Sequence, residues 1–358
     1  TGALRRPTYG LVVGDVQSGK TANFCGLISR ACDIGVPLVI VISGSTKVLR
    51  NQTQSRIDQA LGREGRESIS NGWLHLTKSD WPRPKRRQSG GIEEVWESGD
   101  FPCFDIDPEV VIERIRRGRP AIMVVKKNDA TLERVLNWLE RYSEDLSHRQ
   151  ILFIDDESDS ASVNLVRPEG QEEEEDDEID YARASEINRL IRAGISISEQ
   201  SIYIGYTATP YAALLSDPWE SDRELGQSLY PRDFIVSLPQ PSEHDGTIEF
   251  FSEFGRLRDR INVLDRADVN IVNENTPRDC PESLHNAIVD FIISGALKIG
   301  MQQDSNFHHS MIVHCNVRTS NHEALEGFVR DYLNHIRRSY VRPQLGGQDN
   351  RTEAYAMF

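Results

Sequence analysis

The sequence predicts an α/β protein with a doubly wound, mostly parallel β-sheet. Short apolar runs rich in β-branched residues alternate with stretches of helical periodicity, which is the pattern of βαβ units. The runs are almost continuously apolar, as expected for parallel strands covered on both faces. A glycine-rich loop also follows the first run and precedes a helix, which favours the same architecture.

The expected strands and helices alternate along the chain. Each strand is a short apolar run, and each helix lies between loop or capping residues and the next run. The expected strands are Leu11–Val13, Leu38–Ile42, Trp73–Leu76, Ala121–Val125, Ile151–Ile154, Ile202–Tyr206 and Met311–His314. The expected helices are Ala22–Ile34, Val48–Leu61, Pro108–Arg117, Ala130–Tyr142, Tyr181–Ala193, Glu282–Gly300 and Ser320–Arg338.

At 358 residues the chain is long enough for two domains. We expect a first domain over residues 1–219, with insertion loops at 82–105 and 166–180 that are rich in Pro, Gly or charge. Residues 220–358 are expected to form a connection and then the beginning of a second α/β domain, because an apolar run precedes the last helix. We expect this second domain to be truncated, and because the chain begins without Met we expect it to be a fragment.

The net charge of −15 has a local origin. Residues 169–180 hold nine acidic groups and no basic one, and setting these nine aside leaves −6 for the rest of the chain. We expect this block to be a solvated, mobile loop, because like charges repel one another. Basic clusters such as Arg83–Arg87 remain, so the overall charge does not exclude nucleic-acid binding.

Two further observations bear on location. The five cysteines are scattered, odd in number and without C-x-x-C spacing, which favours a reducing cytoplasm over a disulfide scaffold. No uninterrupted apolar run approaches the ~18 residues that a membrane span needs, so we expect a cytoplasmic protein without a membrane partner.

The strongest functional signal is the segment GDVQSGKT, which matches G-x-x-x-x-G-K-[ST] at every fixed position. Its glycines permit a tight turn in which successive backbone N–H groups point at phosphate oxygens. The following helix N-terminus favours an anion, the lysine neutralises the β- and γ-phosphates, and the threonine hydroxyl binds Mg²⁺. ATP and Mg²⁺ are therefore the expected cofactors. The expected binding residues are Gly14, Gln17, Ser18, Gly19, Lys20 and Thr21.

Carboxylates follow the expected strand Ile151–Ile154 directly. Such a run at the end of a buried strand is costly unless a cation is present. In one register, which reads D-E-x-D, Asp156 holds Mg²⁺ and Glu157 orients or deprotonates the attacking water. In the other register, Asp155 and Asp156 take these roles. We prefer the first register and keep Asp155 as the alternative magnesium ligand.

A third motif, YTATP, follows the expected strand Ile202–Tyr206. The hydroxyl groups of Thr207 and Thr209 can hydrogen-bond the acidic motif and couple it to a second domain. An ordinary turn before proline is the other interpretation of this motif by itself.

These three motifs, in this order, resemble those of the superfamily II helicase and translocase ATPases. In these ATPases the first RecA-like domain carries motifs I, II and III in the same order, and motif II takes the D-E-x-D form. More closely, the segments GLVVGDVQSGKTANF, VISGSTKVLRNQTQSRID, FIDDESDSASVN, GYTATPYA and LYPRDFIV are similar to a bacterial family labelled as Z-one domain endonucleases. The resemblance spans roughly residues 8–240 and continues more loosely into Met311–Arg318.

The resemblance implies a RecA-like P-loop NTPase that acts on nucleic acid, DNA in preference to RNA, in bacterial phage defence or restriction. Lys20, Asp156 and Glu157 would be catalytic, and Thr207 and Thr209 would couple hydrolysis to movement. Genes of the family often lie beside one for an Hsp90/MutL-type ATPase, which is an expected partner together with other defence proteins.

The same resemblance assigns nucleic-acid contacts. Arg50 and Gln54 lie where motif Ia would contact the backbone, and Lys85 and Arg86 in the basic insertion would extend a positive track. Apart from the resemblance, Lys126–Asn128 follow the expected strand Ala121–Val125 at the same edge of the sheet. They could touch a phosphate of nucleotide or of nucleic acid, and an ordinary exposed turn is the other interpretation.

Two alternatives to a nucleic-acid motor stay open. One is an ATP-driven switch that gates partner proteins, and the other is the nuclease that the family label suggests. No arginine-finger motif VI of the form Q-x-x-G-R-x-x-R occurs before Phe358, which leaves turnover by this chain alone open. No carboxylate and lysine set typical of a nuclease stands out beyond the ATPase motifs. The histidines at 308, 309, 314 and 322 lack a clear metal-binding spacing.

Overall fold

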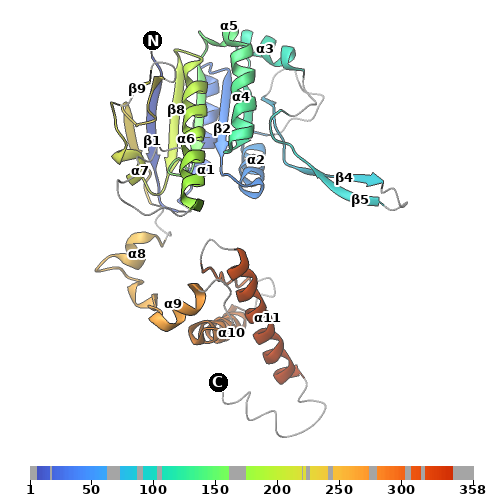
Figure 1. Ribbon diagram of the computed structural model, residues 1–358, viewed down its shortest axis with the longest axis vertical. Coiled ribbons are helices and arrows are strands. Elements are labelled where there is room, and N and C mark those ends of the chain that lie inside the picture. Colours follow the sequence, from blue (N-terminus) through green and yellow to red (C-terminus); the bar gives the residue numbers. More distant parts are fainter. Residues whose placement is uncertain are drawn as a thin grey trace. The chain divides into compact units, whose positions relative to one another are not determined.

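The chain divides into two compact units, residues 1–249 and 250–358, which are described separately below. They are seen in a computed structural model (Figure 1). The structure describes residues 6–16, 18–62, 73–86, 92–102, 107–160, 175–219, 221–222, 226–240, 245–273, 280–302, 308–315 and 319–341.

Unit 1 is built on a seven-stranded sheet in which every neighbouring pair of strands is parallel. The strand order is β11-β1-β8-β7-β2-β6-β3. The predicted α/β class and parallel sheet are therefore confirmed. The strands are β1 (Thr8–Val13), β2 (Leu38–Ser43), β3 (Leu74–His75), β6 (Ala121–Lys126), β7 (Ile151–Asp156), β8 (Ser201–Thr207) and β11 (Phe234–Ser237).

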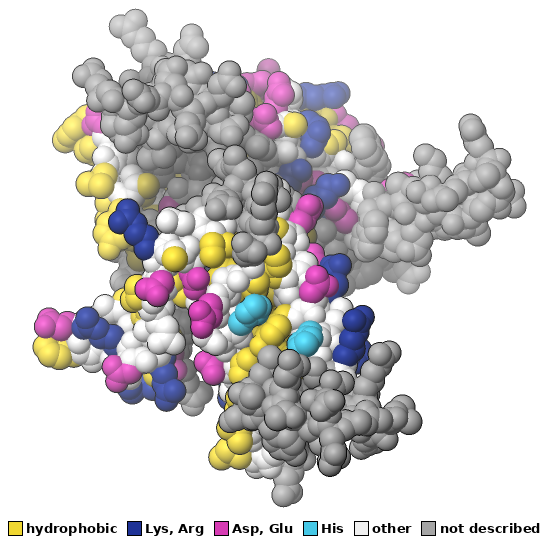
Figure 2. All heavy atoms as spheres, turned by 60° about the horizontal axis from the view of Figure 1, so that its bottom comes forward, with side chains coloured by type: hydrophobic (Ala, Val, Ile, Leu, Met, Phe, Trp, Pro, Cys, Tyr) yellow, Lys and Arg dark blue, Asp and Glu magenta, His cyan; other side chains and the backbone are white. Residues whose placement is uncertain are grey.

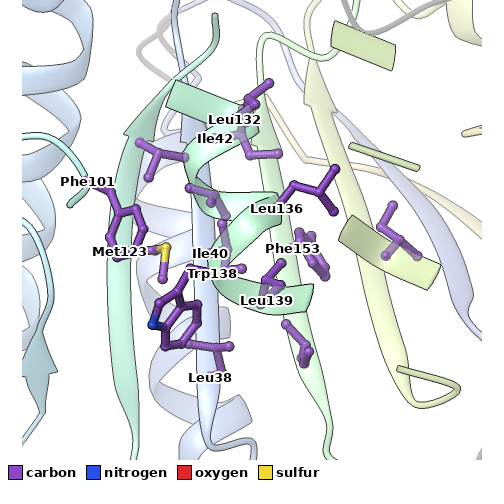
Figure 3. Close-up of a cluster of buried hydrophobic side chains, with 14 of the residues drawn as sticks. Leu38, Ile40, Ile42, Phe101, Met123, Leu132, Leu136, Trp138, Leu139 and Phe153 are labelled. Carbon is purple, nitrogen blue, oxygen red and sulfur yellow. The ribbon is translucent and has the colours of Figure 1, made fainter. Parts of the chain in front are cut away.

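Helices cover both faces of the sheet, which explains why its central strands are mostly apolar. Phe24 and Ile28 from one helix and Ile57 from the next pack on one face. The other face holds a larger cluster, in which Leu136 and Trp138 lie over Ile40 (Figure 3). The helices of unit 1 are α1 (Lys20–Asp33), α2 (Lys47–Leu61), α3 (Pro108–Arg116), α4 (Asp129–Arg141), α5 (Ser143–Leu146), α6 (Glu175–Ser196), α7 (Tyr211–Leu215) and most of α8 (Thr247–Phe251).

Three segments of unit 1 differ from the sequence predictions. The expected loop at 82–105 contains an antiparallel hairpin of β4 (Trp81–Arg86) and β5 (Ile92–Glu97), which projects away from the sheet (Figure 1). Part of the acidic block is helical rather than a loop, because α6 begins at Glu175. Residues 169–174 of that block lie outside the described residues.

The proline-rich stretch 216–250 showed no clear period, yet it supplies two additions to unit 1. One is the short hairpin of β9 (Ser221–Asp222) and β10 (Gly226–Gln227). The other is β11, which pairs with β1 at the sheet edge. A Cβ on Gly10 of β1 would lie 2.0 Å from the Phe234 ring, so glycine is needed for this strand to pack.

In its described residues, unit 2 is helical. It contains a 3₁₀ turn at Arg258–Arg260 and the helices α9 (Arg266–Asn273), α10 (Glu282–Gln302) and α11 (Thr319–Val341). The predicted helices at 282–300 and 320–338 are confirmed. The predicted strand at Met311–His314 is wrong, because residues 308–315 are irregular. His309 stacks on Phe291 of α10, with the ring centroids 4.4 Å apart, so this segment packs as a loop.

Helix α10 has the length and apolar composition of a possible membrane span over Glu282–Met301, and 11% of that stretch is buried. Ile288 of α10 and Leu325 of α11 are buried. Several large apolar side chains of the chain are exposed, and hydrophobic surface is visible among the charged groups (Figure 2). One such helix is weak evidence for a membrane span, and the cytoplasmic location stays a prediction.

We expect Ile40→Ala to lower the free energy of unfolding of unit 1 by about 2–5 kcal/mol. Ile40 is 1% exposed in a central strand, so truncation leaves a cavity in the core cluster on one face of the sheet. Urea denaturation measures the change. Ile34→Ala is the matched control, because Ile34 is 74% exposed, and it should change stability by no more than about 0.5 kcal/mol. Equal losses in the two variants would contradict the packing described here.

Candidate functional site

The glycine-rich loop joins β1 to α1, as the motif predicts. The Gly14 N–H donates to the Thr207 carbonyl at 3.0 Å, which ties the loop to β8. Gly19 takes the left-handed conformation, with φ of 90°, at the N-cap of α1, a geometry that strongly favours glycine. No side chain caps the helix, so its first N–H groups face the loop without a side-chain partner. Gln17 lies outside the described residues.

Lys20 folds back across this loop. Its Nζ donates to the Gly14 carbonyl at 2.9 Å and to the Asp15 carbonyl at 3.0 Å. The buried Ser18 Oγ has no hydrogen-bond partner in the described structure. A cation, an uncapped helix N-terminus and an unpaired hydroxyl therefore converge on one loop, which suits an anion.

The two adjacent aspartates at the end of β7 have different environments. Asp155 is fully buried, with Oδ1 2.8 Å from Lys127 Nζ and Oδ2 accepting from the Tyr203 hydroxyl at 2.7 Å. Asp156 is partly exposed and lines a cavity beside Lys20. Burial raises the pKa of the Asp156 carboxyl, the Glu157 carboxylate raises it further, and Lys127 and Lys20 oppose the rise. Asp156 rather than Asp155 is therefore placed to meet a cation.

Lys127 organises the turn that follows β7. It is 1% exposed, and besides Asp155 its Nζ reaches the carbonyl of Asp156 at 2.8 Å, of Glu157 at 2.7 Å and of Ser160 at 3.3 Å. The hypothesis that Lys127 touches phosphate does not fit this place, since its ammonium group is already bonded inside the protein. The next residue, Asn128, caps α4 by accepting from the Thr131 N–H.

Glu157 stands at the centre of the same turn. It has φ of 54°, the left-handed conformation that residues with a side chain rarely adopt, and its side chain is exposed toward the cavity. The turn lies close over β8, because a Cβ on Gly205 would be 2.7 Å from Ser158 Oγ. The backbone is thus held in an unfavourable conformation that presents a carboxylate to the cavity.

The threonines of the third motif bond the acidic turn. Thr207 Oγ1 donates to Asp159 Oδ1 at 2.7 Å, and Thr209 Oγ1 donates to the other carboxylate oxygen of Asp159. Thr207 Oγ1 also accepts from the Thr209 N–H at 2.9 Å. The structure therefore brings together the second and third motifs, which lie 48 and 50 residues apart.

One cavity of about 1090 Å³ joins all three motifs within unit 1. Its volume is at the upper end of the range typical of ligand pockets. Thr21 and Asp156 both line it and offer the hydroxyl and carboxylate oxygens that Mg²⁺ prefers, so these two residues would hold the ion. No protein-only cluster of three or more metal-binding side chains occurs in the part of the chain that is described. The lining residues that matter here are Gly19, Lys20, Thr21, Arg56, Asp156, Glu157, Asp159, Thr207 and Thr209.

The residues expected to contact nucleic acid on α2 are buried instead. Arg50 is 1% exposed, and its guanidinium donates to the carbonyls of Val124, Lys78 and Gly99. Gln54 is 0% exposed and bonds the side chains of Arg50 and Asp58. Both residues connect α2 to the neighbouring loops, so neither faces a nucleic-acid backbone. Lys85 and Arg86 lie on β4, and their side chains are outside the described atoms.

Sequence reasoning missed two polar residues of the site. Tyr203, in the middle of β8, is the buried partner of Asp155. Arg56, on α2, donates from Nη1 to Thr21 Oγ1 at 3.1 Å. Tyr203 shares its strand with a second tyrosine, Tyr206, so nothing in the pattern marks it out. An arginine on an exposed helical face carries no distinguishing pattern either.

The chain matches a known sequence family over part of its length. Residues 283–356, in unit 2, match the sequence-family model described as Z1 domain, and of the segments that carry the resemblance this match includes the loosely similar Met311–Arg318. No curated protein matches the chain. A solved chain from the "Structure of E. coli MS115-1 HORMA:CdnC:Trip13 complex" is similar over 82% of this chain and 86% of its own length. It has 13% identity and a TM-score of 0.22.

Removing the cation from the buried ion pair should destabilise unit 1 strongly. We expect Lys127→Met to cost about 3–5 kcal/mol, because the Asp155 carboxylate would stay buried without its cation. Adding Asp155→Asn to this variant should restore part of the loss, which thermal or urea unfolding of the two single variants and the double variant would measure. Strictly additive losses would show that the pair is not coupled.

Proposed function

We propose that unit 1 binds ATP with Mg²⁺ and hydrolyses it. The observation that carries the proposal is the cavity in which Lys20 of the glycine-rich loop meets Asp156 and Glu157 of the acidic turn. These groups are more than 130 residues apart in sequence, yet they supply the phosphate cation, the magnesium ligand and the water-orienting carboxylate that phosphoryl transfer requires.

The chain's own residues have distinct parts in this proposal. The Gly14–Thr21 backbone and Lys20 would bind the β- and γ-phosphates, for which Lys20 would exchange its present carbonyl contacts. Thr21 and Asp156 would hold Mg²⁺, whose chemistry is to neutralise charge on the phosphate oxygens. Glu157, presented by its left-handed turn, would orient the attacking water and accept its proton.

The Asp159 contacts support a mechanical use of hydrolysis. Asp159 is two residues from Glu157, and both of its oxygens are held by Thr207 and Thr209. A change at Glu157 on hydrolysis would therefore reach the segment that leads from β8 into α7. We propose that this link drives a helicase- or translocase-like motor on nucleic acid, as the resemblance to superfamily II implies. The resemblance also supports a role in phage defence or restriction and an Hsp90/MutL-type partner, and the scattered cysteines support a cytoplasmic location.

A switch that gates partner proteins is the second candidate. The burial of Arg50 and Gln54 favours it, because two of the four expected nucleic-acid contacts are engaged inside the protein. The motor and the switch would use the same nucleotide chemistry. They differ in whether the conformational change acts on nucleic acid or on a partner protein. A nuclease activity finds no comparable set of side chains in the described residues.

Variants of Lys20 and Glu157 should separate binding from hydrolysis. We expect Lys20→Ala to weaken ATP binding about tenfold or more, because the charge-assisted hydrogen bond to phosphate is removed. Glu157→Gln should retain affinity within about threefold while hydrolysis falls about 10²- to 10⁴-fold. Calorimetric titration and phosphate release measure the two quantities. Unchanged ATP affinity in Lys20→Ala would contradict the proposal.

Nucleic acid should distinguish the motor from the switch. For a motor, we expect ATP hydrolysis to rise with single- or double-stranded DNA, and DNA affinity to fall with salt. Neutralising Arg83, Lys85, Arg86 and Arg87 should flatten the log–log salt dependence by about one unit for each phosphate that the protein no longer neutralises. The control neutralises Arg116 and Arg117, which already pair with acidic side chains on α3 or α5. An absence of salt-dependent binding to DNA or RNA would favour the switch.

A further inference from the structure

Arg56 reaches from α2 to the residue expected to bind magnesium. Its Nη1 donates to Thr21 Oγ1 at 3.1 Å, across 35 positions of sequence. Arg56 is the single arginine among the described residues that line the cavity. Its backbone is fixed by a regular helix whose N-cap, Thr46, accepts from the Leu49 N–H. A cationic side chain is thus held at the mouth of the phosphate loop by an element outside the three motifs.

Matching stripes on two neighbouring helices form this side of the cavity. Arg56, Gln59 and Ala60 on α2 have the i, i+3, i+4 spacing of one helical face. The facing stripe on α1 consists mostly of small side chains, which keeps the space in front of Arg56 open. It is made of Ala22, Cys25, Gly26 and Ser29.

Electrostatics indicates that an anion should lie beside Arg56 when Mg²⁺ is bound. Mg²⁺ binds oxygen ligands at about 2.0–2.1 Å, so a cation held by Thr21 would place two positive charges close to the Arg56 guanidinium. Such an arrangement is repulsive unless an anion lies between them. A phosphate oxygen sharing the shell of that Mg²⁺ would lie within about 4 Å of Thr21 Oγ1. A change of side-chain rotamer would suffice for Arg56 to meet it.

The other described basic side chains near the site already bond other groups of the protein. Lys127 is bonded to Asp155 and to the backbone of the acidic turn, and Arg50 is buried among carbonyl groups. Lys20 belongs to the loop and is assigned to the β- and γ-phosphates. Among the described residues that line the cavity, Arg56 is then the second cation that can meet the charge that develops on the transferred phosphoryl group.

We infer that Arg56 is a catalytic residue that binds the γ-phosphate of the bound nucleoside triphosphate. It leaves Thr21 Oγ1 when the magnesium–nucleotide complex enters and donates its N–H groups to the γ-phosphate oxygens. The planar guanidinium can make two parallel bonds of this kind, a fork geometry that the ammonium group of a lysine lacks. This inference rests on the proposed function, and it adds that the site distinguishes triphosphate from diphosphate through α2.

Direct binding measurements test Arg56 without requiring turnover. The full chain, Arg56→Ala, Arg56→Lys and the control Arg30→Ala are titrated with Mg²⁺ and either ADP or the slowly hydrolysed analogue ATPγS. Arg30 is an exposed arginine of α1 that pairs with Asp33 and does not line the cavity. We expect Arg56→Ala to weaken ATPγS binding about ten- to hundredfold and ADP binding less than about twofold. Arg56→Lys should be intermediate, and Arg30→Ala should match the unaltered chain.

The outcomes separate this inference from the proposed function. If the unaltered chain binds neither nucleotide, the proposed function fails, and the role of Arg56 fails with it. If the unaltered chain binds both and Arg56→Ala binds them with the same affinities, the Arg56 assignment alone is overturned. An equal loss of ADP and ATPγS affinity would also overturn it, because the contact would then not be with the γ-phosphate. A selective loss of ATPγS affinity supports it.

Discussion

The ammonium group of Lys127 lies 2.8 Å from Asp155 Oδ1 and bonds the carbonyls of Asp156, Glu157 and Ser160 at the same time. Burying these charges is costly, and the cost is offset only because Lys127 finds several acceptors and Asp155 also accepts from Tyr203. The acidic turn is therefore fixed by the interior of the protein. Asp156 and Glu157 form its outward face. The left-handed backbone at Glu157 persists because the surrounding bonds determine it.

The parallel sheet explains why these groups meet at all. The carboxyl ends of β1, β7 and β8 lie at one edge, so the loops that follow these three strands share one cavity although they are far apart in sequence. β8 lies between β1 and β7 in the sheet. It is thus placed to bond the glycine-rich loop through the Thr207 carbonyl and the acidic turn through the Thr207 hydroxyl.

The sequence was sufficient for the features that depend on local pattern. Six of the seven sheet strands, the loop with left-handed Gly19 and the pairing of the Thr-Ala-Thr motif with the acidic turn follow from periodicity and motif spacing. The strand β11 could not be predicted, because it is four residues long and lies at an edge, where half-exposed side chains show no period. The segment 311–314 failed for the opposite reason. Its apolar run reads as a strand, but residues 308–315 are irregular and Ile312 is 91% exposed.

Charged side chains were the least predictable part of the site. Arg50 and Lys127 read as surface cations, since these residue types are almost never fully buried unless they are paired. Here each has several backbone carbonyls as partners, and such partners leave no trace in a sequence. The choice between Asp155 and Asp156 was similarly open until burial separated them.

The charges that line the cavity explain together why these acidic and basic side chains lie where they do. Among its described lining residues, Asp156, Glu157 and Asp159 face two cations, Lys20 and Arg56. Burial and Glu157 raise the pKa of Asp156, which means that its charged form is poorly stabilised by the protein itself. A divalent cation would stabilise that form, and a phosphate chain would in turn satisfy Lys20, Arg56 and the uncapped start of α1. Mg²⁺ would thus compensate the carboxylates, and the phosphates would compensate Lys20, Arg56 and the start of α1. Neither compensates both sets of groups alone, so we expect Mg²⁺ and the nucleotide to bind together.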